Sequence, residues 1–242
     1  MMRKPLPVLA ALCASALALS ACDRASDAAF GDRVRAYLLE HPEVIEEAVQ
    51  KLGQKREIEA AQAATSAIET QRAALERDPR DFVANPNGTI TITEFFDYRC
   101  GYCKVAAVEM AKIIKENPDV RVVFKEFPIF GEQSDETAAI MLTDLAKPKT
   151  LELHDRLMAE RSLDDAALDR HLRAVGIDPA AARRAAQAPA IQQQLVDTHE
   201  LAASLGINGT PAFVIGDRLI SGADMEAVRA AITAAQAEKI VG

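Results

Sequence analysis

The apolar positions of this 242-residue chain follow two different patterns, one on each side of about residue 80. Between residues 30 and 80 they recur at helical spacing, and no run alternates as a strand would. From residue 81 onwards, short alternating runs and helical stretches follow one another. The chain is therefore predicted to be an α-helical extension followed by an α/β domain. The clearest helical stripe in the extension contains Val44, Ile45, Ala48, Val49 and Leu52.

Four short runs in the second part have the alternation or the β-branched content of strands. A helical pattern lies between the first two runs, so these strands are expected to be parallel, because a parallel pair needs a crossover connection. A long helical section at about residues 132–206 separates them from the last two runs, which should form a hairpin, and a final helix follows. The four predicted strands are Thr89–Phe96, Val120–Phe124, Ala212–Ile215 and Leu219–Ser221.

Two cysteines, Cys100 and Cys103, lie where the first strand gives way to a helix. Exposed N–H groups and the helix dipole favour an anion at this place, and the thiolate is the nucleophile of disulfide exchange. A structural zinc site would need a second pair or suitably spaced histidines, which the sequence lacks. A structural disulfide closing so short a loop would stabilise little. The pair is therefore predicted to be redox-active, with no metal and no cofactor.

The N-terminus has the features of a secretion signal. Arg3 and Lys4 precede an apolar stretch from Leu6 to Leu19 that ends in small residues, as a signal peptide requires. The uncharged run up to Asp23 is near the minimum length for crossing a bilayer, so a retained anchor helix is an alternative. In both cases the rest of the chain faces an oxidising, extracytoplasmic space.

The segment Leu19-Ser20-Ala21-Cys22 resembles the bacterial lipobox, in which the cysteine is lipidated and becomes the first mature residue. This resemblance implies a lipoprotein-type signal peptide at residues 1–21 and lipidation of Cys22, and Asp23 after it implies retention at the inner membrane. The alternative is ordinary cleavage nearby, with Cys22 incidental.

Composition narrows the function classes only a little. A formal net charge of −8 argues against a nucleic-acid partner. Apolar residues make up 49% of the chain, which indicates a packed core. Without the signal, about 220 residues remain, enough for one sizeable domain and an extension.

One acidic residue, Glu94, stands in the predicted first strand where an apolar residue is expected. Strand alternation places it on one face with Ile90, Ile92 and Phe96. A buried carboxyl has a raised pKa unless it is paired, and it can relay a proton. A plain salt bridge or an exposed edge position is the alternative.

Three segments in order resemble a thioredoxin fold of the DsbA type. The resemblance implies a thioredoxin fold with an inserted helical domain at residues 81–242, the insert at about 132–206. The three segments are Phe95–Cys103 (FFDYRCGYC), Phe124–Pro128 (FKEFP) and Gly206–Phe213 (GINGTPAF).

The extension carries a second resemblance. Phe30–Glu43 (FGDRVRAYLLEHPE) is similar to the N-terminal region of ScsC-like proteins (suppressor of copper sensitivity C). Some members of that branch are oligomers assembled through this region and act as disulfide isomerases. We therefore expect residues 22–80 to be a helical extension, with self-association through residues 30–52 and a linker at 53–80. A solvated stalk is the alternative.

The family's roles transfer to matching positions. Cys100 is the expected exposed nucleophile, and Cys103 is expected to resolve the mixed disulfide. Glu94 matches the buried acid beneath the active site, with Lys125 as its usual partner. Thr210 and Pro211 match the cis-proline loop, whose backbone pairs with an extended substrate. An ordinary trans-proline entering a strand is the alternative for that loop.

Other residues near the pair are weaker candidates. Arg99 places a cation beside Cys100, either favouring the thiolate or forming a solvated surface charge. Gly101-Tyr102 departs from the Pro-His of strongly oxidising relatives, so a weaker oxidant is expected. Residues 127–130 form either an apolar rim for unfolded substrates or part of the core. His199 is expected to be a core or surface residue.

Three functions compete at this point. The first is an oligomeric disulfide isomerase or reductase in the periplasm, lipid-anchored through Cys22 and kept reduced by a DsbD- or ScsB-like membrane donor. The second is a monomeric DsbA-type thiol oxidase with a DsbB-like oxidant. In both, the substrates are unfolded or misdisulfided secreted proteins. The third treats Cys100 and Cys103 as a copper(I) site, since soft thiolates suit that metal.

Overall fold

A computed structural model describes residues 29–241 of the chain. For residues 239–241 it describes only the backbone. The chain divides into two compact units, one ending at Glu59 and the other beginning at Ala60. The predicted signal peptide and Cys22 lie outside the described residues. Within the described residues, no helix is long and apolar enough to cross a bilayer.

The first unit is helical, as expected. Residues 29–40 form one helix, and after a break at His41-Pro42 a second, α2 (Glu43–Glu76), begins and continues into the second unit. Proline suits the start of a helix because it has no N–H to leave unpaired. Large apolar side chains along this unit are exposed: Phe30, Val34, Tyr37, Leu39, Ile45, Val49, Leu52 and Ile58.

The second unit contains a five-stranded sheet. The strand order is β1-β3-β2-β4-β5, in which β2 and β3 are parallel and the other neighbours are antiparallel. The crossover helix α3 (Gly101–Glu116) and the β4–β5 hairpin confirm the predicted order, whereas β1 was not expected. The strands are β1 (Phe82–Ala84), β2 (Ile90–Phe96), β3 (Val120–Glu126), β4 (Ala212–Ile215) and β5 (Arg218–Ser221).

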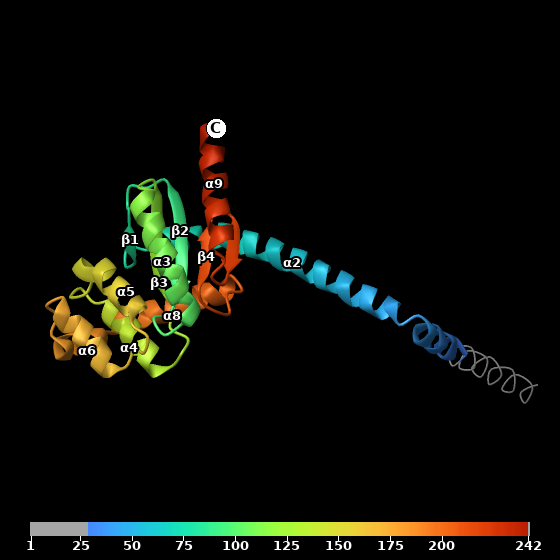
Figure 1. Ribbon diagram of the computed structural model, residues 1–242, viewed down its shortest axis with the longest axis horizontal. Helices are drawn as coiled ribbons and strands as arrows, with labels where there is room; N and C mark the ends of the chain where they lie inside the picture. The colour runs from blue at the N-terminus through green and yellow to red at the C-terminus, as the bar shows by residue number, and fades with distance from the viewer. Residues whose placement is uncertain (1–28, 242) are drawn as a thin grey trace, which may run out of the picture. The chain divides into compact units, whose positions relative to one another are not determined.

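Helices α4 to α8 form the predicted insert between β3 and β4 (Figure 1). Within it, α5 contacts α6, α6 contacts α7, and α4 contacts both α7 and α8. Asp164 and Asp178 cap two of them, each by accepting a hydrogen bond from a backbone N–H. The helices are α3 (Gly101–Glu116), α4 (Glu132–Met141), the short 3₁₀ helix η1 (Lys147–Lys149), α5 (Thr150–Ala159), α6 (Asp165–Ala174), α7 (Pro179–Ala186), α8 (Pro189–Ser204) and α9 (Met225–Val241).

Both faces of the central strands β2, β3 and β4 are buried, in two separate apolar clusters. One contains Ile92 and Phe96 of β2 and helices α3, α5 and α9, while the other contains Phe95 and helices α2 and α8. Successive residues of a strand point to opposite faces, so β2 contributes alternately to the two clusters.

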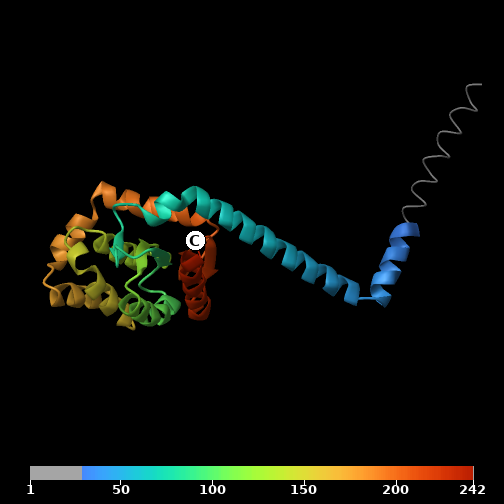
Figure 2. The ribbon, with the colours of Figure 1, turned by 90° about the horizontal axis from the view of Figure 1, so that it is seen from above.

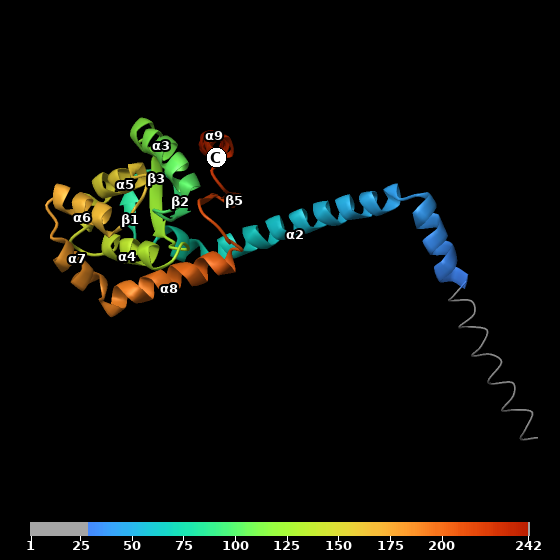
Figure 3. The ribbon, with the colours of Figure 1, turned by 60° about the horizontal axis from the view of Figure 1, so that its bottom comes forward.

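The C-terminal part of α2 belongs to the second cluster. Ile68 and Leu75 are fully buried there, and this part of the helix lies alongside α8 (Figures 2 and 3). The domain therefore begins at Ala60 rather than at residue 81, and residues 60–76 are not a linker. The packing of this part of α2 is hard to predict from its alanine-rich sequence, because only two large side chains of the helix are buried.

Candidate active site

The two cysteines lie at the N-terminus of α3. Cys100 is the N-cap residue, and its Sγ accepts a hydrogen bond from the backbone N–H of Cys103 at 3.4 Å. Both cysteines are free thiols, and Cys103 is fully buried. Burial raises the pKa of the Cys103 thiol far above its usual value. Cys103 therefore needs a nearby group to take its proton before it can act as a nucleophile.

Cys100 is less accessible than the sequence predicted. Its exposed fraction is 3%, because Sγ lies against the backbone of another segment and donates a hydrogen bond to the carbonyl oxygen of Thr210 at 3.2 Å. The Thr210-Pro211 peptide bond is cis, as expected from the sequence. The cis-proline segment, which precedes β4, therefore lies directly against the first cysteine.

Asp97, between β2 and the cysteines, is a residue that sequence reasoning missed. It is 2% exposed, and its carboxylate accepts four hydrogen bonds from the active-site turn and from the chain after β3. The donors are the N–H groups of Arg99 (2.7 Å), Ile129 (2.7 Å) and Phe130 (3.2 Å) and the hydroxyl of Ser134 (2.8 Å). The acidic residue just before the CxxC motif was the available signal.

The segment that Asp97 holds carries exposed apolar side chains. Ile129 and Phe130 are 37% and 48% exposed. Arg99, expected beside the thiolate or in solvent, donates a hydrogen bond to the Phe130 carbonyl oxygen at 2.9 Å. Phe127 is instead buried, with His199 against its ring at 4.8 Å between centroids. Of the predicted apolar rim at residues 127–130, Ile129 and Phe130 are therefore exposed, whereas Phe127 belongs to the core.

Glu94 is fully buried in the central strand, on the predicted face. In the sheet register, Phe124 and Phe213 flank it, and neither of its carboxyl oxygens has a hydrogen-bond partner. Burial raises the pKa of Glu94 to about 8. The carboxyl therefore exchanges its proton near neutral pH, as a proton relay requires.

Lys125 is not the partner of Glu94, and this expectation was wrong. Lys125 is in register with Phe95 and so points to the opposite face of the sheet. There its ammonium group pairs with Asp81 and donates a hydrogen bond to the carbonyl oxygen of Ala74 in α2 at 2.6 Å. The lysine therefore joins α2 and the start of β1 to the sheet.

Three further titratable residues are buried on the face that holds Glu94. The Tyr98 hydroxyl donates to Glu126 Oε1 at 3.1 Å and lies 3.4 Å from His154 Nδ1. Burial raises the pKa of Glu126 well above its usual value and lowers that of His154 to about 4. Sequence reasoning missed all three, although alternation along β3 places Glu126 on the same face as Phe124.

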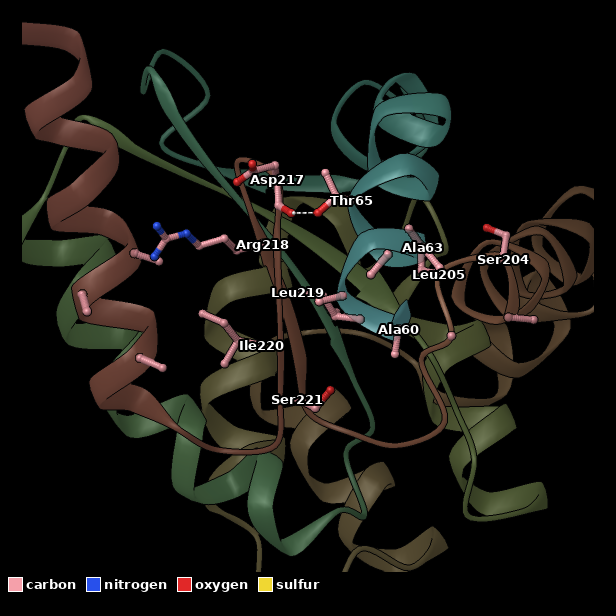
Figure 4. Close-up of a pocket in the computed structure, with 17 residues that line it drawn as sticks. Ala60, Ala63, Thr65, Ser204, Leu205, Asp217, Arg218, Leu219, Ile220 and Ser221 are labelled. Atoms are coloured by element: carbon pink, nitrogen blue, oxygen red, sulfur yellow. Dashed lines mark hydrogen bonds between the residues drawn. The ribbon is translucent and has the colours of Figure 1, made fainter. Parts of the chain in front are cut away.

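A cavity of about 920 Å³ lies elsewhere in the second unit. It is lined by α2 from Ala60 to Thr65, the end of α8, β5 and α9, and by neither cysteine. Figure 4 shows Thr65, whose hydroxyl donates to the Asp217 carbonyl oxygen at 3.3 Å. The cavity is therefore separate from the cysteine pair.

Comparison with known proteins identifies both parts of the chain. Residues 91–157 and 137–233 match the DSBA-like thioredoxin domain. Residues 27–61 match the copper resistance protein ScsC N-terminal domain. The second match covers the segment whose sequence resembles the ScsC-like extension.

Solved structures of other proteins are similar to this chain over most of its length. BcfH from Salmonella enterica Typhimurium is 30% identical, with a TM-score of 0.71 over 91% of this chain and 98% of that one. ScsC from Proteus mirabilis, in a transitional conformation, is 29% identical, with a TM-score of 0.64 over 89% and 99% of the two chains.

A curated relative matches part of the chain. The thiol:disulfide interchange protein DsbA of Bordetella pertussis is 27% identical over 141 residues, or 55% of this chain and 66% of that protein. The chain thus spans just under two thirds of this relative's length. The profile match, the structural neighbours and the placement of the cysteines agree: the chain belongs to the DsbA family of thioredoxin-fold oxidoreductases, in its ScsC-like branch.

Proposed function

We propose that this protein exchanges disulfides with unfolded or misdisulfided secreted proteins, acting as an isomerase or reductase. The observation that carries the proposal is the contact between Cys100 Sγ and the Thr210 carbonyl oxygen at 3.2 Å. It brings a thiol at a helix N-terminus against a backbone segment that can pair with an extended peptide.

The reaction begins on the reduced pair. The Cys100 thiolate attacks one sulfur of a substrate disulfide, that S–S bond breaks, and the other substrate sulfur leaves as a thiolate. In isomerisation, a substrate thiolate then attacks the mixed disulfide and frees Cys100 unchanged. In reduction, Cys103 attacks Cys100 Sγ, so that the pair is oxidised and the substrate gains two electrons.

Glu94 is the proposed acceptor of the Cys103 proton in that second step. The Cys103 thiol is buried and has a strongly raised pKa, and Glu94 is buried with a pKa of about 8. Proton transfer between two such groups avoids forming a bare thiolate in the apolar interior. A membrane donor of the DsbD or ScsB type would return the electrons to the oxidised pair.

Isomerase action is favoured over oxidase action by the extension. Its exposed apolar side chains, among them Ile45, Val49 and Leu52, form a surface suited to self-association, and several active sites on one particle suit the scanning of a misfolded substrate. Gly101-Tyr102 between the cysteines also provides no imidazole to stabilise the thiolate.

The proposed location is the periplasm, with Cys22 lipidated and held at the inner membrane. It is supported by the signal-like N-terminus and by the similarity of the chain to a periplasmic thioredoxin-like protein from Salmonella enterica serovar Typhimurium. Metabolic labelling with a radioactive fatty acid, in cells expressing the full chain or Cys22→Ala, should label only the former.

The decisive experiment measures refolding of a scrambled-disulfide protein together with solution mass. Mature protein should reactivate the substrate, Cys100→Ser should abolish the activity, and deletion of residues 30–59 should reduce both association and isomerisation. The deletion must stop there because Ile68 and Leu75 belong to the core. Val49→Glu should act like the deletion, whereas Glu57→Gln, on the same helix, should act like the unmodified protein.

If the deletion reduces neither activity nor association, the second candidate, a monomeric thiol oxidase, is favoured. That candidate requires a high reduction potential, so equilibration of the cysteine pair with glutathione separates the two. Unchanged thiol exchange in Cys100→Ser would contradict both.

A further inference from the structure

The described chain contains four buried side-chain polar atoms with no hydrogen-bond partner, and three belong to two glutamates. They are both oxygens of Glu94 and Oε2 of Glu126, and the fourth is the hydroxyl oxygen of Thr210. Unpaired buried oxygens are costly, so a group of them requires a specific explanation. Protons held on the carboxyls, and shared between them, would supply one.

The sheet register places the two glutamates close together. Glu94 is opposite Phe124 on the neighbouring parallel strand, and Glu126 is two residues further along on the same face. With the usual strand spacing and rise, their backbones are about 8 Å apart. Two glutamate side chains can span this gap, either directly or through one bridging water.

The partners of Glu126 determine which of its oxygens is available. Oε1 accepts the Tyr98 hydroxyl at 3.1 Å, which leaves Oε2 free to carry a proton. Glu94 has both oxygens free to accept one. His154 Nδ1, from α5, lies 3.4 Å from the same hydroxyl. Because the hydroxyl donates its proton to Oε1, Tyr98 holds that oxygen in place and leaves Oε2 without a donor.

We propose that Glu94 and Glu126 form a buried acid pair that shares one proton between Glu126 Oε2 and the Glu94 carboxylate, with Glu126 as a positioning residue for proton transfer. This inference rests on the proposed role of Glu94 in accepting the Cys103 proton. The form of the pair that accepts the Cys103 proton holds one proton, and it holds two after Cys103 has been deprotonated.

The surrounding charges favour retention of protons by the pair. Asp97, after β2, and Asp81, before β1, are further carboxylates that raise the pKa of Glu126, as does Glu94 itself. Lys125, a cation at the end of β3, points away and is paired with Asp81. His154 is neutral at physiological pH because burial lowers its pKa to about 4.

A shared proton has a measurable consequence. A carboxylate that accepts a short hydrogen bond from a carboxylic acid is stabilised, so the second proton binds to the pair at a lower pH than it would bind to Glu94 alone. Glu126→Gln replaces that bond with a weaker one from an amide. The midpoint for protonation of Glu94 should therefore move upward.

The test measures the rate at which Cys103 resolves a mixed disulfide between Cys100 and a peptide, across the pH range. Glu126→Gln should shift the midpoint of the Glu94-dependent limb upward by about one pH unit, slowing resolution roughly tenfold below both midpoints. Glu94→Gln should remove the limb, and the double variant should behave like Glu94→Gln. Glu116→Gln, the same change at an exposed site on α3, should leave the profile unchanged.

The outcomes separate this inference from the proposed function. A Glu126→Gln profile that superimposes on that of the unmodified protein overturns the acid pair and leaves the role of Glu94 intact. A limb that persists in Glu94→Gln overturns the proton relay itself.

A measurement on the unmodified protein keeps the inference testable if Glu126→Gln does not fold. With carbon-13-labelled glutamate, the infrared signal of the buried protonated carboxyls should disappear in two separated steps as the pH rises. Disappearance in a single step would overturn the shared proton.

Discussion

The two faces of the central sheet bury charge in opposite ways. On one face, Lys125 and Asp81 are each 2% exposed and form an ion pair, with Ala74 of α2 accepting a further hydrogen bond. On the other face, Glu94 and Glu126 have no cation beside them, and three of their four oxygens are unpaired. The first arrangement fastens elements together. The second leaves two carboxyls whose pKa values are raised by burial, that of Glu94 to about 8, and a carboxyl that titrates near neutral pH is one that a catalyst can use.

The largest expected effect comes from breaking the ion pair. Lys125→Met leaves the Asp81 carboxylate buried without its cation, and the free energy of unfolding at pH 7 should fall by about 3–5 kcal/mol. Urea unfolding followed by circular dichroism measures this change. Lys125→Met combined with Asp81→Leu should recover most of the loss, and a double variant as unstable as the single one would contradict the pairing.

Replacing Glu94 should have the opposite effect to replacing Lys125: stability should increase, by an amount that depends on pH. Its pKa is raised from 4.5 to about 8 on folding, so the folded state binds more protons than the unfolded state between these values. Stability therefore falls as the pH rises through this window. Glu94→Gln removes this pH dependence. The free energy of unfolding of the variant, relative to that of the unmodified protein, should therefore rise by a few kcal/mol between pH 5 and pH 8.

Urea unfolding at the two pH values checks this expectation, with Glu116→Gln as the exposed control. The comparison between the pH values matters more than either value alone, because the buried amide of Gln carries a fixed cost at both. An equal difference in stability at pH 5 and pH 8 would show that Glu94 is already ionised at pH 5.

Asp97 is expected both to stabilise the fold and to position the segment that contains Ile129 and Phe130. Asp97→Asn cannot accept all four hydrogen bonds, so the free energy of unfolding should fall by roughly 1–3 kcal/mol. Because Ile129 and Phe130 lose their anchoring, KM for a peptide substrate should rise, while exchange with a small dithiol should change little. Phe130→Ala should reproduce the rise in KM without the loss of stability, and equal losses for both substrates would contradict a positioning role.

The smallest effect is expected at Tyr98. Tyr98→Phe keeps the ring, which packs edge-on against Phe96 at 5.2 Å between centroids, and removes only the hydroxyl that serves Glu126. A loss of about 1 kcal/mol is expected. Thermal unfolding monitored by calorimetry is precise enough to detect it, and an unchanged midpoint would indicate that water replaces the hydroxyl.

Much of the site could be predicted from the sequence because its signals are local. The strand, the cysteine pair and the start of α3 are contiguous, and alternation within β2 was sufficient to place Glu94 on the same face as Ile92 and Phe96. The proline loop was predicted from its own short segment. In each case, one stretch of chain carries the whole pattern.

The remaining features depend on contacts between distant segments. β2 and β3 are buried on both faces, so hydrophobic pattern alone does not fix their relative register, and a shift of one residue reverses which side chains share a face. Lys125 was paired with Glu94 from the family resemblance alone, which does not reveal that it is in register with Phe95, and Glu126 was overlooked. The burial of Ile68 and Leu75 likewise depends on apolar surface supplied by α8 and the sheet.

The burial of Cys100 has a consequence for the choice of partner. Because only 3% of the Cys100 residue is exposed, we expect a disulfide held rigidly within a compact protein to be excluded, since the neighbouring structure would collide before the sulfurs met. A pliable, unstructured stretch laid along the Thr210 backbone can deliver its sulfur edgewise. For the proposed exchange, we therefore expect selection by conformational disorder around a cystine, so that correctly matured proteins escape attack without any recognition of their sequence.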